Sequence, residues 1–155
     1  MAESWATRRM RWGVNLFYAF AAGGARVTYI GADWREVRVE VPLNWRTRNY
    51  VGTIFGGAIY AAVDPIYMLM LIHCLGLEYI VWDKAATIRF RRPGRSTLRA
   101  EFRLEDAELD AIRRETAEKT SIDRVYRVEL KDTEGAVCAE VEKTLYIRRK
   151  NAAQT

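Results

Sequence analysis

The stretch that most constrains the fold is residues 49–76, NYVGTIFGGAIYAAVDPIYMLMLIHCLG, in which a glycine pair opens a long apolar segment. Residues 58–75 are apolar on almost every side, which predicts a helix buried on all faces. One carboxylate, Asp64, lies near the middle and is followed directly by Pro65. Because a buried carboxylate is costly unless it has a partner or a task, Asp64 is the first candidate functional residue.

The polar residues of this predicted helix fall on one side. At 3.6 residues per turn, Gly57, Tyr60, Asp64 and Tyr67 share a narrow stripe, whereas His73 points the other way. Two other interpretations stay open. The length suggests a membrane span, but the central Asp-Pro pair and the hydrophilic flanking strands argue against one, and we expect none. Asp64 could also be structural, as the cap of a half-helix that restarts at the proline.

Length and composition favour a single domain over residues 1–155. The chain has a mass of 17.9 kDa and is 50% hydrophobic, which is enough for a sizeable core. Cys74 and Cys138 show neither metal-ligand nor disulfide-framework spacing, so we expect a reducing, cytoplasmic compartment and no metal or cofactor. Basic residues at 8–11 and an apolar run at 13–22 loosely mimic a secretory signal, but a helix packed on the domain fits better.

The charge pattern gives little evidence for a nucleic-acid partner. The net charge is +5 and the pI is about 9.4. The excess is concentrated at residues 89–95 and 148–150. Such clusters can meet phosphate groups, but no nucleic-acid-binding motif accompanies them. We therefore expect no nucleic-acid partner.

Hydrophobic periodicity and turn residues predict, before the buried helix, a helix over 5–22 that ends at a glycine pair and strands over 26–32 and 36–43. After the buried helix they predict a hairpin of strands over 79–91 and 98–104, then a short helix or irregular crossover over 105–116. The last two predicted strands cover 124–131 and 136–148. An antiparallel sheet wrapped around one helix explains why that helix is apolar all round, so the fold class is α+β. Residues 151–155 are expected to be a disordered tail.

The arrangement from about residue 26 to residue 148 resembles the hot-dog fold, specifically the acyl-CoA thioesterases of the phenylacetic-acid-degradation type. In that family an asparagine precedes a Gly-Thr/Val-x-His-Gly-Gly segment, and an acidic residue follows on the helix. Here Asn49, Gly56, Gly57 and Asp64 meet that spacing. The segments GTIFGGAIYAAVDP and WDKAATIRFRRPGR also look like those of an uncharacterised bacterial branch of hot-dog proteins.

The resemblance implies hydrolysis of an acyl-CoA-like thioester. The backbone N–H of Gly57, at a helix N-terminus, would hold the thioester carbonyl oxygen. Asp64 would act as general base or as nucleophile, and Asn49 would position the water or the thioester. Gly57 and Asp64 lie about 10 Å apart along one helix. The family brings the acid of one protomer to the glycine of the other, so we expect a homodimer or a dimer of dimers.

Seven further residues are expected to line the substrate site: Gly56, Phe55, Tyr60, Tyr67, Asp83, Lys84 and Arg91. Arginine recognises phosphate well, so Arg91 and its neighbours could meet the phosphates of coenzyme A. Asp83 is a candidate second polar group of the site. An ion pair of Lys84 with Asp83 or with Asp64 is an equally good interpretation.

Two departures from the family pattern lie beside the expected chemistry. The family's histidine before the glycine pair is Phe55 here, and Pro65 directly follows the acid. The proline is expected to bend the helix or to free the carbonyl of Ala61. The alternative function is therefore a protein that binds an acyl group, a fatty acid or another lipid without catalysis.

Overall fold

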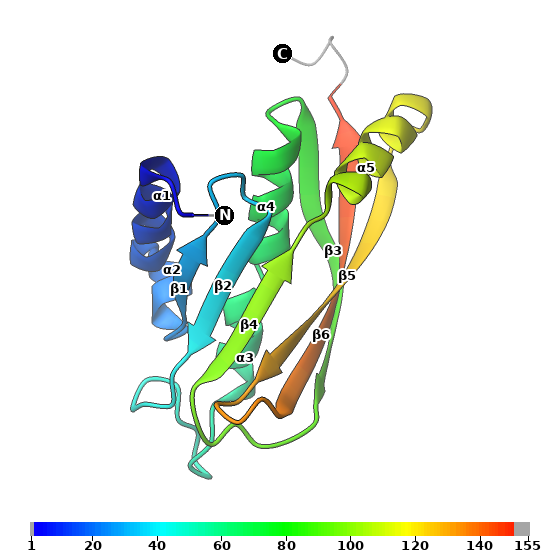
Figure 1. Ribbon diagram of the computed structural model, residues 1–155. Helices are drawn as coiled ribbons and strands as arrows, with labels where there is room; N and C mark the ends of the chain where they lie inside the picture. Colours follow the sequence, from blue (N-terminus) through cyan, green and yellow to red (C-terminus); the bar gives the residue numbers. More distant parts are fainter. Residues whose placement is uncertain (1, 151–155) are drawn as a thin grey trace.

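The computed structural model describes residues 2–150. Its elements in chain order are α1 (Trp5–Leu16), α2 (Tyr18–Ala22), β1 (Arg26–Ile30), β2 (Glu36–Val41), α3 (Gly56–Val63), α4 (Ile66–Leu75), β3 (Tyr79–Phe90), β4 (Leu98–Arg103), α5 (Asp106–Glu118), β5 (Ile122–Lys131) and β6 (Val137–Arg149). Within the described residues, six strands form one sheet, which curves around the central helix formed by α3 and α4 (Figure 1). The predicted α+β class is confirmed.

The strand order of the sheet is β1-β2-β4-β5-β6-β3, and all neighbours are antiparallel. The predicted hairpin between residues 79–91 and 98–104 is wrong, because β3 pairs with β6 while β4 lies between β2 and β5. The physical reason is length. The 12-residue β3 pairs along nearly the whole of the 13-residue β6, from Tyr79↔Arg149 to Phe90↔Ala139. This long register outweighs the few contacts that a local hairpin with the 6-residue β4 would give.

The N-terminal helix predicted over 5–22 is two helices. Phe17 adopts an extended backbone, with φ −62° and ψ 116°, and so separates α1 from α2. A capping box between Ser4 and Thr7 starts α1. The predicted end at the glycine pair is confirmed, since Gly23 caps α2 and Gly24 has a φ of +78°.

The two edge strands of the sheet, β1 and β3, differ in whether other segments cover them. The edge of β1 is covered by side chains from the N-terminal segment. Asn15 Nδ2 donates to the carbonyl of Val27 at 2.9 Å, Val27 N–H donates to Asn15 Oδ1 at 2.7 Å, and Ile30 N–H donates to Glu3 at 3.1 Å. Within residues 2–150 no further strand pairs with the other edge, β3, and its residues from 82 to 90 are mostly exposed. The open backbone groups of β3 can therefore receive another strand.

The central helix is interrupted at Asp64 and Pro65, between the end of α3 at Val63 and the start of α4 at Ile66. Proline has no N–H to donate to the preceding turn, which explains the break. Gly56–Leu75 as a whole is the one described segment long and apolar enough to cross a membrane by length and composition. Half of its apolar window is buried inside the structure, as expected for a core helix.

Gly24 gives a direct test of how α2 is terminated. Gly24→Ala should lower the free energy of unfolding by about 1–3 kcal/mol, because alanine at φ +78° is strained. Its Cβ would also lie 2.5 Å from Thr47 Cγ2. Gly13→Ala is the matched control. A Cβ at Gly13 in α1 meets nothing within 4 Å, so this change should raise stability by about 0.5–1 kcal/mol. Denaturant unfolding measures both, and a wild-type value for Gly24→Ala would contradict this account of the turn.

Candidate active site

The centre of the candidate site is Lys143, which the sequence analysis did not single out. This β6 residue has a side chain only 1% exposed. Its Nζ lies 2.7 Å from Asp64 Oδ1, 2.8 Å from the Asp64 carbonyl oxygen and 2.8 Å from Asp83 Oδ1. One ammonium group thus joins the break of the central helix to β6 and β3.

The surroundings keep Lys143 charged. Burial by itself lowers the pKa of this ammonium group, but the hydrogen bonds and charges of Asp64 and Asp83 outweigh burial, and the pKa is raised. The ring of Tyr60 lies 5.6 Å from the ammonium nitrogen. Burial raises the pKa of the Tyr60 hydroxyl, as does its hydrogen bond to Asp64. The Asp64 carboxylate therefore receives a hydrogen bond from a buried ammonium, yet its side chain stays 45% exposed.

The ion pairs that the sequence suggested for Lys84 are wrong. Lys84 pairs with Asp123 of β5 at 2.6 Å, and Lys143 takes the place expected for Lys84 beside both Asp64 and Asp83. The reason is strand geometry, because successive side chains of β3 point to opposite faces of the sheet. Only the inward face meets the helix.

One sequence signal could have revealed Lys143. Along β6 the inward positions alternate with outward ones, and Val141, Leu145 and Ile147 are buried at inward positions. Lys143 lies in the same phase. A lysine at a position that the alternation assigns to the core requires a buried acidic partner, and Asp64 is the carboxylate of the apolar helix.

The second part of the candidate site is the N-terminus of α3. Phe55 is the N-cap residue and makes no side-chain capping hydrogen bond, so its side chain satisfies none of the free N–H groups of the first turn. The Phe55 ring lies against Gly57, where an added Cβ would be 2.3 Å from Phe55 Cε1. The Phe90 ring lies against Gly56 in the same way, at 2.8 Å. Both glycines are therefore places where an aromatic ring approaches the backbone closely.

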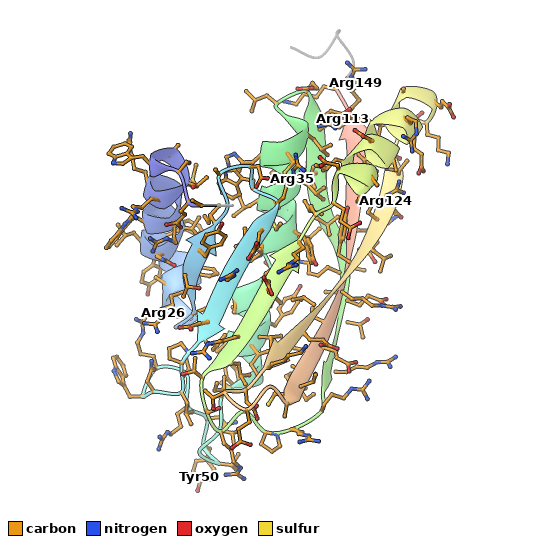
Figure 2. All side chains as sticks on the ribbon, viewed as in Figure 1. Arg26, Arg35, Tyr50, Arg113, Arg124 and Arg149 are labelled. Carbon is orange, nitrogen blue, oxygen red and sulfur yellow. The ribbon has the colours of Figure 1, made fainter. Side chains whose placement is uncertain are left out.

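Asn49 shapes the loop that leads into α3. Its Oδ1 accepts hydrogen bonds from the N–H groups of Val51 and Thr53, and its Nδ2 donates to the Thr53 hydroxyl at 2.9 Å. Tyr50 projects from the tip of this loop, away from the rest of the protein (Figure 2). In the single chain the amide of Asn49 is thus engaged with its own loop.

A cavity of about 380 Å³ lies beside the N-terminus of α3 and includes Asn49, Gly56, Phe90 and Arg91 in its lining. Arg91 forms an ion pair with Glu140 at 2.8 Å, and Arg92 also lines the cavity. The described residues contain no group of three His, Cys, Asp or Glu side chains that could hold a metal ion. The polar groups at this end are backbone donors, guanidinium groups and the side chains of Asn49 and Thr53.

Tyr67 does not join the site. Its ring is buried, stacks on Tyr126 at 4.6 Å and meets Phe102 edge-on at 5.1 Å, and burial raises its pKa to about 12. Tyr67 lies on the face of α4 that packs against the sheet, where the rings of Tyr126 and Phe102 receive it. His73 also lies elsewhere, stacked on Trp34 at 3.8 Å.

A third feature is an apolar groove of about 420 Å³ between the N-terminal helices and the outer face of the central helix. Met10, Gly13, Phe17, Ala61 and Met68 are among its lining residues. Asp64 also lines it and is the one charged residue among the described residues that do so. Asp64 therefore borders both the groove and the Lys143 cluster.

Comparison with known families now places the chain. The model of a family described as a domain of unknown function, DUF4442, matches residues 7–147. The chain belongs to the DUF4442 family. No curated protein matches this DUF4442 protein in sequence.

Solved structures confirm the hot-dog fold. PA5026 from Pseudomonas aeruginosa, described as a protein of unknown function and probable thioesterase, has a TM-score of 0.85 and 22% identity over 96% of this chain and 99% of its own. Thioesterase HI1161 from Haemophilus influenzae has a TM-score of 0.70 and 16% identity over 99% and 97%. A mutant of thioesterase PA1618 from Pseudomonas aeruginosa has a TM-score of 0.68 and 14% identity over 91% and 93%.

A double-mutant cycle tests the cluster. Lys143→Met combined with Asp64→Asn should give a coupling free energy of about 1–3 kcal/mol, because each single change leaves a buried charge or its partner without a hydrogen bond. Lys84→Met combined with Asp123→Asn is the matched control on an exposed pair and should give about 0.2–1 kcal/mol. Both are measured by denaturant unfolding. Equal coupling in the two cycles would mean that Lys143 is held no more strongly than a surface lysine.

Proposed function

We propose that this DUF4442 protein hydrolyses an acyl thioester, with an acyl-CoA-like molecule as substrate. The observation that carries the proposal is the Asp64 carboxylate, half exposed and held by the buried ammonium of Lys143 at a break in the central helix. The thioesterase descriptions of several proteins of the same fold support it. The free thiols of Cys74 and Cys138 suit a cytoplasmic setting.

Asp64 is the group that activates the nucleophile. Lys143 holds one carboxylate oxygen and the carbonyl of the same residue, which fixes the side chain in one orientation. As general base, Asp64 takes a proton from water while the water oxygen bonds to the acyl carbon. The C–S bond then breaks, and the thiolate that leaves takes up a proton. Direct attack by the carboxylate is the other route and passes through an anhydride.

The oxyanion that forms on the acyl carbon needs donors, and the uncapped N-terminus of α3 supplies them. Free N–H groups and the helix dipole favour negative charge there. The Gly57 N–H and Asp64 of one chain lie about 10 Å apart along the helix, however. We therefore assign the Gly57 N–H of one protomer and Asp64 of its partner to each site.

The open edge of β3 supports that dimer. Asp83, near one end of β3, contacts Lys143 and so borders the Asp64 half of the site. Phe90, at the other end, contacts Gly56 and so borders the glycine half. When two copies of β3 pair antiparallel about a two-fold axis, the Asp83 end of one protomer lies opposite the Phe90 end of its partner. This pairing brings each acid to the partner's glycine.

Coenzyme A would reach the site from the glycine end. The cavity beside the N-terminus of α3 carries Arg91 and Arg92, and arginine binds phosphate through paired N–H groups. Its volume of about 380 Å³ is in the range of small-molecule sites. The Arg91 ion pair with Glu140 is exposed, and such pairs exchange partners at little cost.

A second candidate function is supported by Phe55. The Phe55 ring lies against Gly57 and so crowds the proposed oxyanion donors. Phe55 stands where the acyl-CoA thioesterases that the sequence resembles have a histidine. A protein that binds an acyl group, a fatty acid or another lipid without hydrolysis would tolerate that contact. The two functions differ in one observable, which is release of the thiol.

Asp64→Asn should lower thiol release from a panel of short-chain, long-chain and aromatic acyl-CoAs by about 10²- to 10⁴-fold, because the change removes the base or nucleophile. Asp123→Asn, which removes an exposed carboxylate on the other face of the sheet, is the matched control and should retain wild-type activity. The measurement is the rate of free thiol formation. Full activity of Asp64→Asn would remove Asp64 from the mechanism, and no thiol release by the wild type would favour the binding protein.

Subunit mixing tests the shared site. Gly57→Pro removes the proposed N–H donor at a first-turn position, and the exposed Phe55 ring has to rotate away, because a Cβ at Gly57 would lie 2.3 Å from Phe55 Cε1. Asp64→Asn removes the acid. Each variant alone should be inactive while keeping its fold by circular dichroism. After unfolding and refolding together at equal amounts, the mixture should recover about a quarter of wild-type activity, because half of the dimers are mixed and each has one intact site. No recovery would show that each site lies within a single protomer.

A further inference from the structure

We propose that the groove between the N-terminal helices and the central helix binds the acyl chain of the substrate, a chain of medium length with about six to ten carbons. This inference rests on the proposed function, because it assigns a substrate class to the same site. It identifies the groove-facing residues of α1 and α2 as a wall of the binding site.

The floor of the groove is one face of the central helix. Ala61, Asp64, Pro65, Met68 and Leu69 follow the spacing i, i+3, i+4, i+7 and i+8. The turn at Asp64 and Pro65 lies in the middle of this face, so a chain lying along the groove passes directly beside the acid. The Asp64 carboxylate therefore lies at the surface of the groove and is not covered by its apolar residues.

The far wall of the groove is held firmly. Asn15 exchanges two hydrogen bonds with the backbone of Val27, and Glu3 joins Arg11 at 2.8 Å and the backbone of Ile30 at 3.1 Å. These contacts fix α1 against the edge of β1 (Figure 1). The extended backbone of Phe17 then turns α2 away from α1. The groove is therefore a built feature of the fold and not a gap beside a loose helix.

The chemistry of the groove selects an aliphatic ligand. Met10, Val14, Phe20, Met68 and Leu69 present methyl, methylene and aromatic surface, and Asp64 is the one charged residue among the described lining residues. A volume of about 420 Å³ suits a small molecule. Docking of another protein requires a much larger surface, so a lipid-like chain is the occupant that fits.

The length of the floor limits the length of the chain. At about 1.5 Å per residue, the helix from Ala61 to Leu69 spans about 12 Å. An extended alkyl chain with C–C bonds of about 1.5 Å advances about 1.3 Å per carbon, so about nine carbons cover the floor. With its carbonyl group beside Asp64, a chain that runs toward Leu69 covers about 7.5 Å of this floor with about six carbons, so a chain of medium length fits the groove.

Gly13 offers a clean way to fill the groove. It lines the wall on α1, and a Cβ added there meets nothing within 4 Å, so a larger side chain enters open space without displacing its neighbours. Gly13→Phe should lower kcat/KM for a ten-carbon acyl-CoA by roughly tenfold or more and leave a two-carbon or four-carbon substrate within about twofold. Leu16→Phe, one turn away at an exposed position of α1 outside the groove, is the matched control and should change neither.

A binding measurement separates this proposal from the proposed function. Decanoate should raise the melting temperature of Asp64→Asn, which is expected to be inactive, and should lose that effect when Gly13→Phe is added, because a ligand stabilises only the state that binds it. If Gly13→Phe abolishes the decanoate effect but the wild type releases no thiol from any acyl-CoA, the groove still binds an acyl chain and the proposed hydrolase activity is wrong. Three results would overturn the assignment of the groove to the acyl chain. They are an unchanged dependence of kcat/KM on chain length in Gly13→Phe, equal stabilisation of Asp64→Asn by decanoate with and without Gly13→Phe, and a change in oligomeric state in place of ligand binding.

Discussion

A buried ammonium group has to be surrounded by acceptors, and the structure of this protein around Lys143 follows from that requirement. Removing such a charge from water costs several kcal/mol unless good hydrogen bonds replace the water. In place of water, the Lys143 ammonium contacts two carboxylates, of Asp64 and Asp83, and one carbonyl oxygen, of Asp64. Asp64 lies 79 residues from Lys143 in the sequence. The carbonyl is that of Asp64 at the Asp64-Pro65 break, where the helix is interrupted. Pro65, which departs from the pattern of the thioesterases that the sequence resembles, thus lies where hydrogen bonds from Lys143 join the central helix to the sheet.

The two edges of the sheet explain why one chain holds only half of each proposed site. At β1, hydrogen bonds from Asn15 and Glu3 close the edge, and α1 covers it. At β3, the edge is open and its two ends border the acid and the glycine pair respectively. In the dimer that we propose, antiparallel pairing of two β3 strands completes each site. The N-terminal helices have a second role on the closed side, because they wall the groove that passes Asp64.

Much of the fold could be predicted from residues 49–76 and the alternating strands, because hydrophobic periodicity is a local property of the chain. The buried helix, the strand positions, the glycine-terminated N-terminal segment and the hot-dog architecture all followed from it or from the family resemblance. The hairpin of β3 with β4 did not, since strand pairing depends on which long strands match in register. The single helix over 5–22 failed for a similar reason, because Asn15 is bound to a neighbouring strand just before the extended Phe17.

The sequence by itself determined which residue types were available for chemistry, namely an acid on an apolar helix behind a glycine pair, with phenylalanine where the acyl-CoA thioesterases that the sequence resembles have histidine. Only the tertiary structure decided which groups meet. Lys143 and not Lys84 holds Asp64, and Tyr67 packs on Tyr126 instead of lining the site. The physical reason is that side-chain direction depends on strand register and on which face of the helix packs against the sheet. Those are set by packing between distant segments, and no local pattern encodes them.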